Sequence, residues 1–510
     1  MSNDHRIAKN TLFLYIRMAL AMIVSLYTVR VVLQVLGVED YGIFSAVGGI
    51  MSSLTIFMTT LSTASQRFFS FELGKGDTNS LNRVFNAIVV LYLLIGLFTL
   101  AIVETVGVWF LYNKMIIPPE RLYAAFIILQ CTIISFIVSI ISSPFQAMII
   151  AKENMKIYAY VGMYDVIVKL LIVFLLQLFE ADKLVLYGFL LLLASISSQL
   201  IYFLYSKHKY KEISLKLRWD ISTMKSVFFF SGWSFIGSLA LLFNTQGLNL
   251  LMNVFFGPVA NAAYNIANSV RNSSCQLAGN LFVAVRPNMI KEFALDNFSY
   301  VRKLFMFSTK IIFCLLFIIM FPIIIETEAI LSLWLGNVGD HMVSFVRLML
   351  IWGIILNISE PITAIVQAAN KVKQYHLKVD CFTLLTLPLS YIAFKFGFSP
   401  EMAFVTSILL FIIALFIRLY FLKNIIDISL KLYFRAIILK LILVLGISLG
   451  VVIGLKYLIC EDSLMMFCFY ILLEMIVAVS ACYFILLDKE ERARINGMLR
   501  QVYGKIFSKL

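Results

Sequence analysis

Residues 84–112 read VFNAIVVLYLLIGLFTLAIVETVGVWFLY, and this stretch decides the fold class. It contains one charged residue, Glu104, and it is longer than the ~20 apolar residues that a helix needs to cross the hydrocarbon core of a bilayer. Similar stretches recur along the chain, of whose 510 residues 61% are apolar, with a mean hydropathy of +0.94. Soluble domains are roughly half apolar, so the sequence is that of an integral membrane protein.

The apolar stretches are predicted to be helices. The chain has only nine prolines and no long run of alternating apolar and polar residues, which argues against an outer-membrane barrel. The first segment is too long for the apolar region of a signal peptide, and we expect it to be retained as a helix. The sequence therefore predicts an all-α polytopic protein with fourteen transmembrane helices, at 10–36, 41–66, 84–112, 121–151, 157–179, 184–206, 226–256, 258–285, 304–325, 342–370, 376–397, 400–422, 435–457 and 463–487.

The charges of the connecting loops predict the orientation. An even number of helices places both termini on one side, and Lys and Arg accumulate in cytoplasmic loops. With cytoplasmic termini, most of the 42 Lys and Arg lie on the cytoplasmic side, whereas external loops carry acidic residues such as Asp40 and Glu180. Basic clusters such as Lys207 to Lys211 then act as topology signals that also rest on anionic lipid heads. The bilayer, and not a nucleic acid, is the partner that the net charge of +14 indicates.

The chain also contains an internal repeat. A shift of 220 residues aligns Leu36-Gly37 with Phe256-Gly257, and a shift of 217 aligns Pro144 with Pro361. Helices 1 to 6 and 7 to 12 are therefore predicted to form two related six-helix bundles with helices 13 and 14 appended. Because six helices return the chain to its starting side, the predicted relation is a pseudo-twofold along the membrane normal, with the site in a cleft between the bundles. The predicted domains are 1–220, 221–425 and 426–510.

Three further features carry a family resemblance: the basic, Asn-containing start at 6–10, the turn LGVEDYG at 36–42, and the stretch 144–158. In these the chain resembles the polysaccharide flippase branch, the O-antigen and teichoic-acid exporters, of the multidrug/oligosaccharidyl-lipid/polysaccharide exporter superfamily. The resemblance implies a V-shaped fourteen-helix protein of the bacterial inner membrane. It also implies movement of an undecaprenyl-diphosphate-linked oligosaccharide, for O-antigen, lipopolysaccharide or capsule, between leaflets. The polysaccharide polymerase machinery is a further partner on this basis.

Among the charges within the predicted helices we single out eleven, because a charge at bilayer depth is costly and needs a reason. They are Arg17, Arg30, Lys169, Arg271, Arg347 and Arg418, and Glu104, Asp165, Glu360, Asp380 and Glu474. Interface positions or the appended helices account for Glu104, Arg347, Asp380, Arg418 and Glu474. The other six are candidates for a polar pathway.

Arg271 is the strongest candidate, because the rise of a helix places it near mid-bilayer, beyond snorkelling distance. Beside it Asn261, Asn265, Asn268, Asn272 and Gln276 recur every three or four residues and trace one helical face. Arg suits diphosphate recognition, since its guanidinium can donate two parallel hydrogen bonds. The predicted substrate-binding residues are Arg271, Arg30, Arg17, Asn268, Asn272, Asn265, Asn249 and Asn253. Helix packing for the amides and snorkelling for Arg17 and Arg30 remain open alternatives.

Two sites are candidates for a coupling ion such as H⁺ or Na⁺. Glu360 precedes Pro361, which removes a backbone hydrogen bond and favours a helix break. Asp165 and Lys169 stand four residues apart on one predicted helix and can pair. Glu360 could equally neutralise an arginine from the facing bundle, and the Asp165–Lys169 pair could be purely structural.

The sequence shows no nucleophile motif, nucleotide-binding loop or paired metal ligands, so we expect no catalytic residue, metal or cofactor. The leading function is a secondary-transporter-like flippase that works by alternating access. One alternative is an ion-coupled multidrug or cation antiporter of the same superfamily, although the excess of basic residues in the helices favours an anionic substrate. A second alternative is a membrane enzyme of polysaccharide assembly, which would need a larger extramembrane loop than the one near 326–341.

Overall fold

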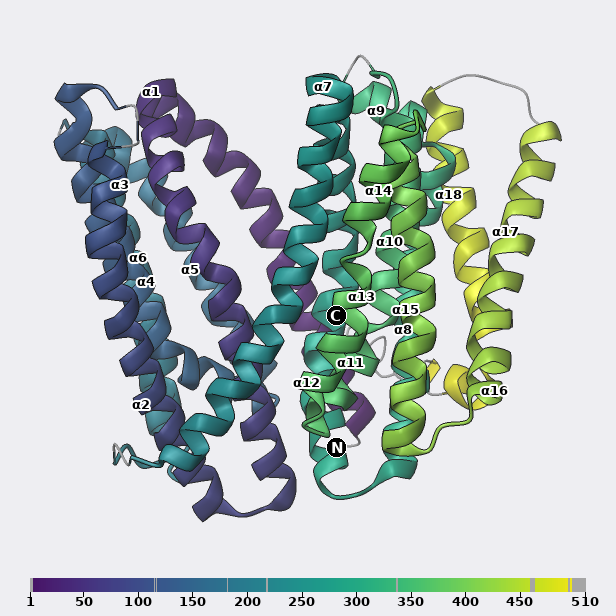
Figure 1. Cartoon of the computed structure of the whole chain (residues 1–510), viewed down its shortest axis with the longest axis horizontal. Helices are drawn as coiled ribbons and strands as arrows, with labels where there is room; N and C mark the ends of the chain where they lie inside the picture. The colour runs from purple at the N-terminus through teal and green to yellow at the C-terminus, as the bar shows by residue number, and fades with distance from the viewer. Residues whose placement is uncertain are drawn as a thin grey trace, which may run out of the picture. The chain divides into compact units, whose positions relative to one another are not determined.

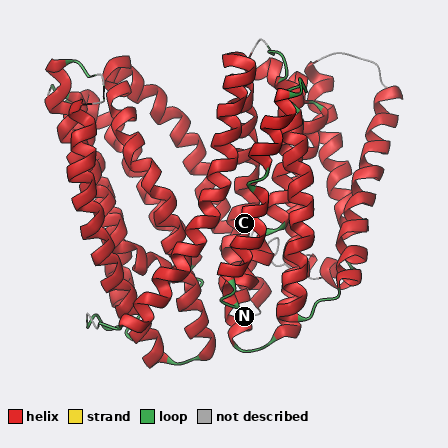
Figure 2. Ribbon diagram, viewed as in Figure 1, coloured by secondary structure: helices red, strands yellow, loops and turns green. Residues whose placement is uncertain are grey.

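A computed structural model describes residues 3–113, 115, 117–180, 182–216, 219–335, 338–458, 464–493 and 496–497, and leaves out the side chains of some further helical residues, Arg30 and Asn253 among them. Figure 2 shows that the described residues form helices and loops without a strand. The all-helical class predicted from the sequence is confirmed.

The helices belong to two compact units, Lys9–Phe235 and Met1–Ala8 with Ile236–Leu510. The first contains most of α1 (Asn3–Lys75), then α2 (Thr78–Ile102), the π-helix η1 (Val103–Gly107), α3 (Val108–Asn113), η2 (Pro119–Arg121), α4 (Leu122–Ala151), α5 (Met155–Leu178), α6 (Lys183–Lys209) and the start of α7 (Ile221–Ala294). The second contains the rest of α7 and α8 (Phe298–Ile325), α9 (Thr327–Leu335), α10 (Met342–Ile358), α11 (Glu360–Ala368), α12 (Val372–Tyr375), η3 (His376–Asp380), α13 (Cys381–Thr383), α14 (Thr386–Lys395), α15 (Met402–Ile426), α16 (Leu430–Tyr433), η4 (Phe434–Ile438), α17 (Leu439–Leu458), α18 (Leu464–Ala481) and η5 (Cys482–Leu486). Figure 1 labels these elements. The predicted domain boundaries at 220 and 425 stay predictions.

Eleven helical segments among the described residues are long and apolar enough to cross a membrane. They coincide with eleven of the predicted spans, from 84–112 onward with the exception of 258–285. The other three predicted spans, 10–36, 41–66 and 258–285, lie in the long helices α1 and α7. The protein is thus a multi-pass membrane protein, and the count of fourteen stays a prediction.

Where the sequence predicts a turn at 36–42, the structure has a break of a single residue inside α1. Gly37 has φ 79° and ψ 170°, and Gly257 breaks α7 in the same way with φ 79° and ψ −172°. Only glycine adopts this region without strain, so the chain changes direction at one residue and resumes its helix at once. The two glycines are 220 residues apart, the predicted repeat distance.

Other left-handed residues repeat at the predicted distances as well. Gly76 and Asp296 both have positive φ at the ends of α1 and α7, again 220 residues apart, since 296 − 76 = 220. Glu153 and Asn370 both have positive φ and follow helices that contain Pro144 and Pro361, at a distance of 370 − 153 = 217. The local backbone therefore supports the internal repeat that the sequence predicts.

Candidate functional site

Arg271 lies on the second half of α7, where its side chain is only 6% exposed. Its Nη2 donates to Asn268 Oδ1 at 2.8 Å and to Asn272 Oδ1 at 2.9 Å. The guanidinium carbon stands 4.6 Å from the ring centroid of Trp352 on α10, within cation–π range. No ion pair among the described residues includes Arg271, so its charge is held by neutral groups and remains available to an anion.

Two of the predicted amides therefore hold the guanidinium, which neither alternative for the stripe had included. The same face of α7 is open to its surroundings, since Asn265, Asn272 and Gln276 are exposed and Asn268 is half-buried. Asn249, on the first half of α7, is half-buried and has interaction partners. The side chain of Asn253 lies outside the described residues. An exposed amide face above a buried cation is the geometry that the sequence predicts for a polar, anion-binding surface.

In the first unit, Arg17 on α1 lies over Tyr158 of α5, with the guanidinium carbon 4.6 Å from the ring centroid. Gly162, one turn further along α5, makes room for the aliphatic part of Arg17, because a Cβ there would collide with it. The side chain of Arg30 lies outside the described residues. Asp165 and Lys169 form the predicted ion pair at 2.7 Å, and Ser198 of α6 also donates to Asp165.

The predicted break at Pro361 is present, because α10 ends at Ile358 and α11 begins at Glu360. The exposed Glu360 side chain lies within the electrostatic reach of Arg286 and Arg418. Arg286 of α7 donates to Gln367 of α11, a bond that ties the two helices together. The arginines near Glu360 therefore belong to its own unit, whereas the sequence interpretation had placed such an arginine in the facing bundle.

His376 and Asp380 of η3 contact each other through the imidazole Nδ1 and a carboxylate oxygen. Together with Glu360 and its two arginines they form a group of ionisable residues that we call the Glu360 cluster: Arg286, Glu360, His376, Asp380 and Arg418. The sequence missed Arg286 because the predicted span ended at residue 285, whereas α7 continues to Ala294. A helical pattern that carried on past 285 was the available signal.

Two of the charges that the sequence assigned to a helix end or an appended helix are buried in the protein. Arg418 is 5% exposed, and its Nε and Nη1 have no hydrogen-bond partner among the described residues. Glu474 on α18 is fully buried, with Lys456 Nζ 3.6 Å away and bound more closely to Glu326. Hydropathy alone cannot show burial of this kind, because it depends on which helices pack around the residue.

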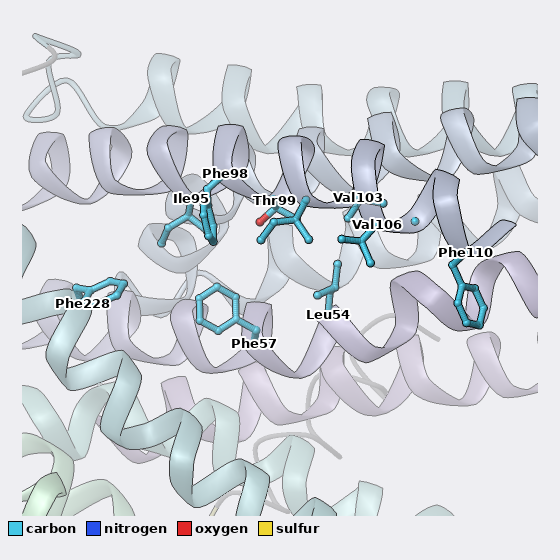
Figure 3. Close-up of a pocket in the computed structure, with 11 residues that line it drawn as sticks. Leu54, Phe57, Ile95, Phe98, Thr99, Val103, Val106, Phe110 and Phe228 are labelled. Atoms are coloured by element: carbon cyan, nitrogen blue, oxygen red, sulfur yellow. The ribbon is translucent and has the colours of Figure 1, made fainter. Parts of the chain in front are cut away.

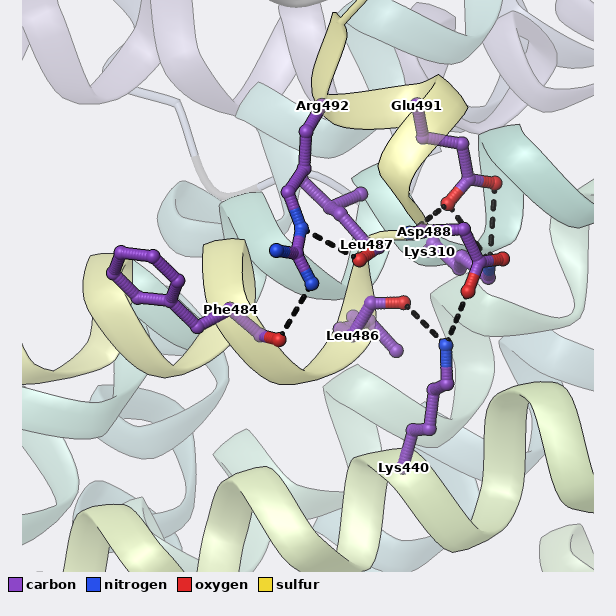
Figure 4. A network of polar contacts seen from close by, with 8 residues as sticks. All are labelled: Lys310, Lys440, Phe484, Leu486, Leu487, Asp488, Glu491 and Arg492. Atoms are coloured by element: carbon purple, nitrogen blue, oxygen red, sulfur yellow. Dashed lines mark hydrogen bonds and ion pairs between the residues drawn. The ribbon is translucent and has the colours of Figure 1, made fainter.

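Figure 4 shows a second charge network that the sequence missed. Lys310, inside α8 and almost fully buried, binds Asp488 at 2.6 Å and Glu491 at 2.8 Å, and Lys440 of α17 binds Asp488 at 2.6 Å. Partial burial opposes ionisation of Asp488, but the hydrogen bonds from the two lysines outweigh it and lower the pKa of this carboxyl. The network fastens the segment after η5 to α8.

A pocket of about 590 Å³ lies in the first unit, between the second half of α1, α2 and the start of α7 (Figure 3). Phe57, Phe98, Phe110 and Phe228 line it, and the hydroxyl of Thr99 is the polar group drawn there. Its lining runs along α2, η1 and α3 from Ile95 to Phe110, about 22 Å at the helical rise. The pocket has the length and the apolar character that a hydrocarbon chain needs.

The sequence model of a family described as polysaccharide biosynthesis protein matches residues 7–291, more than half of the chain. The chain belongs to this family. The resemblance found in the sequence is thereby confirmed at the level of the family. Comparison with curated protein sequences gives no match.

Solved structures of membrane transporters share the fold. A MATE protein crystallised in the straight conformation aligns with a TM-score of 0.73 and 12% identity over 84% of this chain and 97% of that chain. An outward-facing multidrug resistance MATE family transporter of the MOP superfamily aligns at 0.69 with 13% identity, over 84% and 96%. A MOP superfamily transporter from Pyrococcus furiosus, for which reverse polarity of the binding pocket suggests a different function, aligns at 0.70 with 13% identity over the same shares. The chain thus belongs to the polysaccharide biosynthesis family and shares its fold with these transporter structures.

Proposed function

We propose that this protein is a flippase that moves an undecaprenyl-diphosphate-linked oligosaccharide between the leaflets of a bacterial inner membrane by alternating access. The observation that carries the proposal is Arg271, a buried cation held by amides and an indole instead of a carboxylate. A buried charge without an ionic partner is costly, and an anionic substrate would offset that cost. A diphosphate is such an anion, and the planar guanidinium can bind two of its oxygens.

The exposed amides of α7 fit the sugar part of the same substrate. Amide groups both donate and accept hydrogen bonds, and an oligosaccharide presents hydroxyls that do the same. Exposed amides on a membrane helix avoid lipid and line water-filled space, where a hydrophilic head group would travel. The apolar pocket in the first unit fits the third part of the substrate, its polyprenyl chain.

The charge at the proposed substrate site also favours a flippase over a cation antiporter. Cationic drugs favour acidic surroundings, whereas Arg271 supplies a positive charge without a carboxylate partner among the described residues. The Pyrococcus furiosus transporter supports the view that this fold accommodates binding pockets of different polarity. Glu360, exposed at a helix break between two arginines, is the residue that we assign to a coupling ion such as H⁺ or Na⁺. We further infer that both termini are cytoplasmic and that the protein functions together with a polysaccharide polymerase.

Reconstitution distinguishes the two transport functions. Proteoliposomes that contain the full chain receive a fluorescent undecaprenyl-diphosphate oligosaccharide or a cationic dye, under an imposed pH or Na⁺ gradient. We expect leaflet transfer of the lipid-linked sugar well above that of protein-free liposomes and no gradient-driven dye uptake. Dye uptake without sugar transfer would instead establish the antiporter.

A further inference from the structure

A small basic pocket lies in the first unit, where α6 leads into the loop before α7. Its volume is about 400 Å³, and the residues that line it include Phe85 of α2, Phe145 of α4, Lys207 of α6 and Lys211 of the following loop. The two phenylalanine rings pack edge to face, with their centroids 5.4 Å apart. They form the apolar part of the pocket lining, and the two lysines form the basic part. The pocket is thus amphipathic.

Neither lysine is bound to a carboxylate among the described residues, although Lys207 Nζ lies 5.8 Å from the ring centroid of Phe203. Both lysines are exposed, and neither belongs to an ion pair among the described residues. Two carboxylates lie between them and α7, and both have basic partners elsewhere: Glu212 is bound by Lys152 from the end of α4, and Asp220 by Arg83 of α2. Burial raises the pKa of Tyr210 to about 12, so its phenol stays neutral. The local charge at the pocket is therefore positive and not internally compensated.

The loop that forms one wall is held in place by buried amides. Asn86 of α2, 2% exposed, donates to the Ser214 carbonyl at 2.8 Å and accepts from the Lys216 backbone N–H at 2.7 Å. Asn82, one turn earlier, donates to the Ser214 hydroxyl at 2.8 Å. A loop that served only as a topology signal would need its charges but not this fixed geometry. The clamp keeps the lysines beside the apolar part of the lining.

We propose that this pocket binds the phosphate head group of an anionic phospholipid, with the phosphate between Lys207 and Lys211 and the glycerol region against Phe85 and Phe145. Basic pockets between membrane helices on the cytoplasmic side are suited to such head groups, and each lysine near the surface contributes on the order of 1 kcal/mol. The apolar part of the lining favours a lipid over free phosphate, because a small inorganic anion gains nothing from two aromatic rings. The site is independent of the transported substrate.

Native mass spectrometry of the purified full chain tests the site, with phosphatidylglycerol, phosphatidylethanolamine or inorganic phosphate as the added ligand. We expect wild type to retain one phosphatidylglycerol more tightly than phosphatidylethanolamine, and the pair Lys207→Ala and Lys211→Ala to weaken that binding about 30-fold, the product of two lysines. The conservative pair Lys207→Arg and Lys211→Arg should retain phosphatidylglycerol binding. This result would show that the loss in the alanine pair comes from the removed charge and not from misfolding.

The matched control is the pair Lys209→Ala and Lys225→Ala, which removes the same charge from the same end of the unit but leaves the pocket lining intact. We expect this control to bind phosphatidylglycerol as wild type does. If both double substitutions weakened phosphatidylglycerol binding equally, the cause would be diffuse surface charge, and the proposal would be overturned. Unchanged binding in the Lys207/Lys211 pair, or displacement of the lipid by millimolar inorganic phosphate, would overturn it as well.

Discussion

Arg17 and Arg271, two of the residues predicted from sequence, are accommodated in the same way in different units. The aliphatic part of each passes a glycine of a neighbouring helix, Gly162 or Gly353, and each guanidinium lies 4.6 Å from an aromatic ring centroid. A ring face stabilises the cation while it leaves the guanidinium edge to hydrogen-bond acceptors, which for Arg271 include the side-chain oxygens of Asn268 and Asn272. The sequence indicated the arginines, but their glycine and aromatic partners come from other helices and depend on packing.

Gly353 gives a residue-scale prediction. A Cβ at this position would lie 2.9 Å from Arg271 Cγ and 3.1 Å from Cys275 Sγ, so Gly353→Ala must displace the arginine. Overpacking of this kind costs about 1–3 kcal/mol, partly offset by the ~1 kcal/mol gain in helix propensity. We expect at least a fivefold weaker affinity for undecaprenyl diphosphate with little change in thermal stability, measured by a binding titration and by thermal unfolding.

Gly279 on α7 provides the control for that substitution, because a Cβ there would meet nothing within 4 Å. Gly279→Ala should therefore bind the diphosphate as wild type does. Wild-type affinity in Gly353→Ala would show that the position of Arg271 does not matter for anion binding.

At the scale of elements, the sequence predicted most of what lies within one helix and little of what lies between helices. Hydropathy located the spans, and the repeat located both glycine breaks, since these are local properties of the chain. The Glu360 cluster was out of reach, because Arg286, Glu360 and Arg418 come from α7, α11 and α15 and meet only when these helices pack. Lys310 lies within the predicted span 304–325 and was visible in the sequence, but its carboxylate partners lie beyond residue 487 and reach it only through packing.

The Lys310 network predicts a pH-dependent contribution of the segment after η5. The pKa of Asp488 is lowered in the folded protein, so its stabilising contribution is present above the unfolded pKa of ~3.9 and is lost as the pH falls through the folded value. We expect Asp488→Asn to lower stability at pH 7 by a few tenths to about 1 kcal/mol. The measurement is thermal unfolding of wild type and variant in detergent from pH 7 to pH 3.

The difference between the two proteins should shrink as the pH falls below 4. A difference that stays constant over the whole range would mean that the charge of Asp488 does not fasten this segment. Asp340→Asn, a change of a carboxylate in a different loop, serves as the comparison for non-specific charge effects.

At the scale of the whole molecule, the family, the fold and the buried cation together support the substrate class that we propose. A lipid-linked diphosphate oligosaccharide has an anionic, a hydroxyl-rich and an apolar part, and the protein offers Arg271, the exposed amides of α7 and the apolar pocket in matching chemistry. The sequence reached the same class through its excess of basic residues in the membrane. What it could not supply was the neutral environment of Arg271, which makes that charge available.

The most direct test is the rate of leaflet translocation in proteoliposomes, followed as the sugar of a fluorescent undecaprenyl-diphosphate oligosaccharide becomes accessible to an external lectin. The comparison is wild type, Arg271→Ala, and Arg83→Ala as a control at an exposed arginine, with all three shown to unfold at similar temperatures. We predict transfer by wild type and Arg83→Ala, and at least a tenfold slower rate in Arg271→Ala. Equal rates in all three proteins, or no transfer by wild type, would contradict the account.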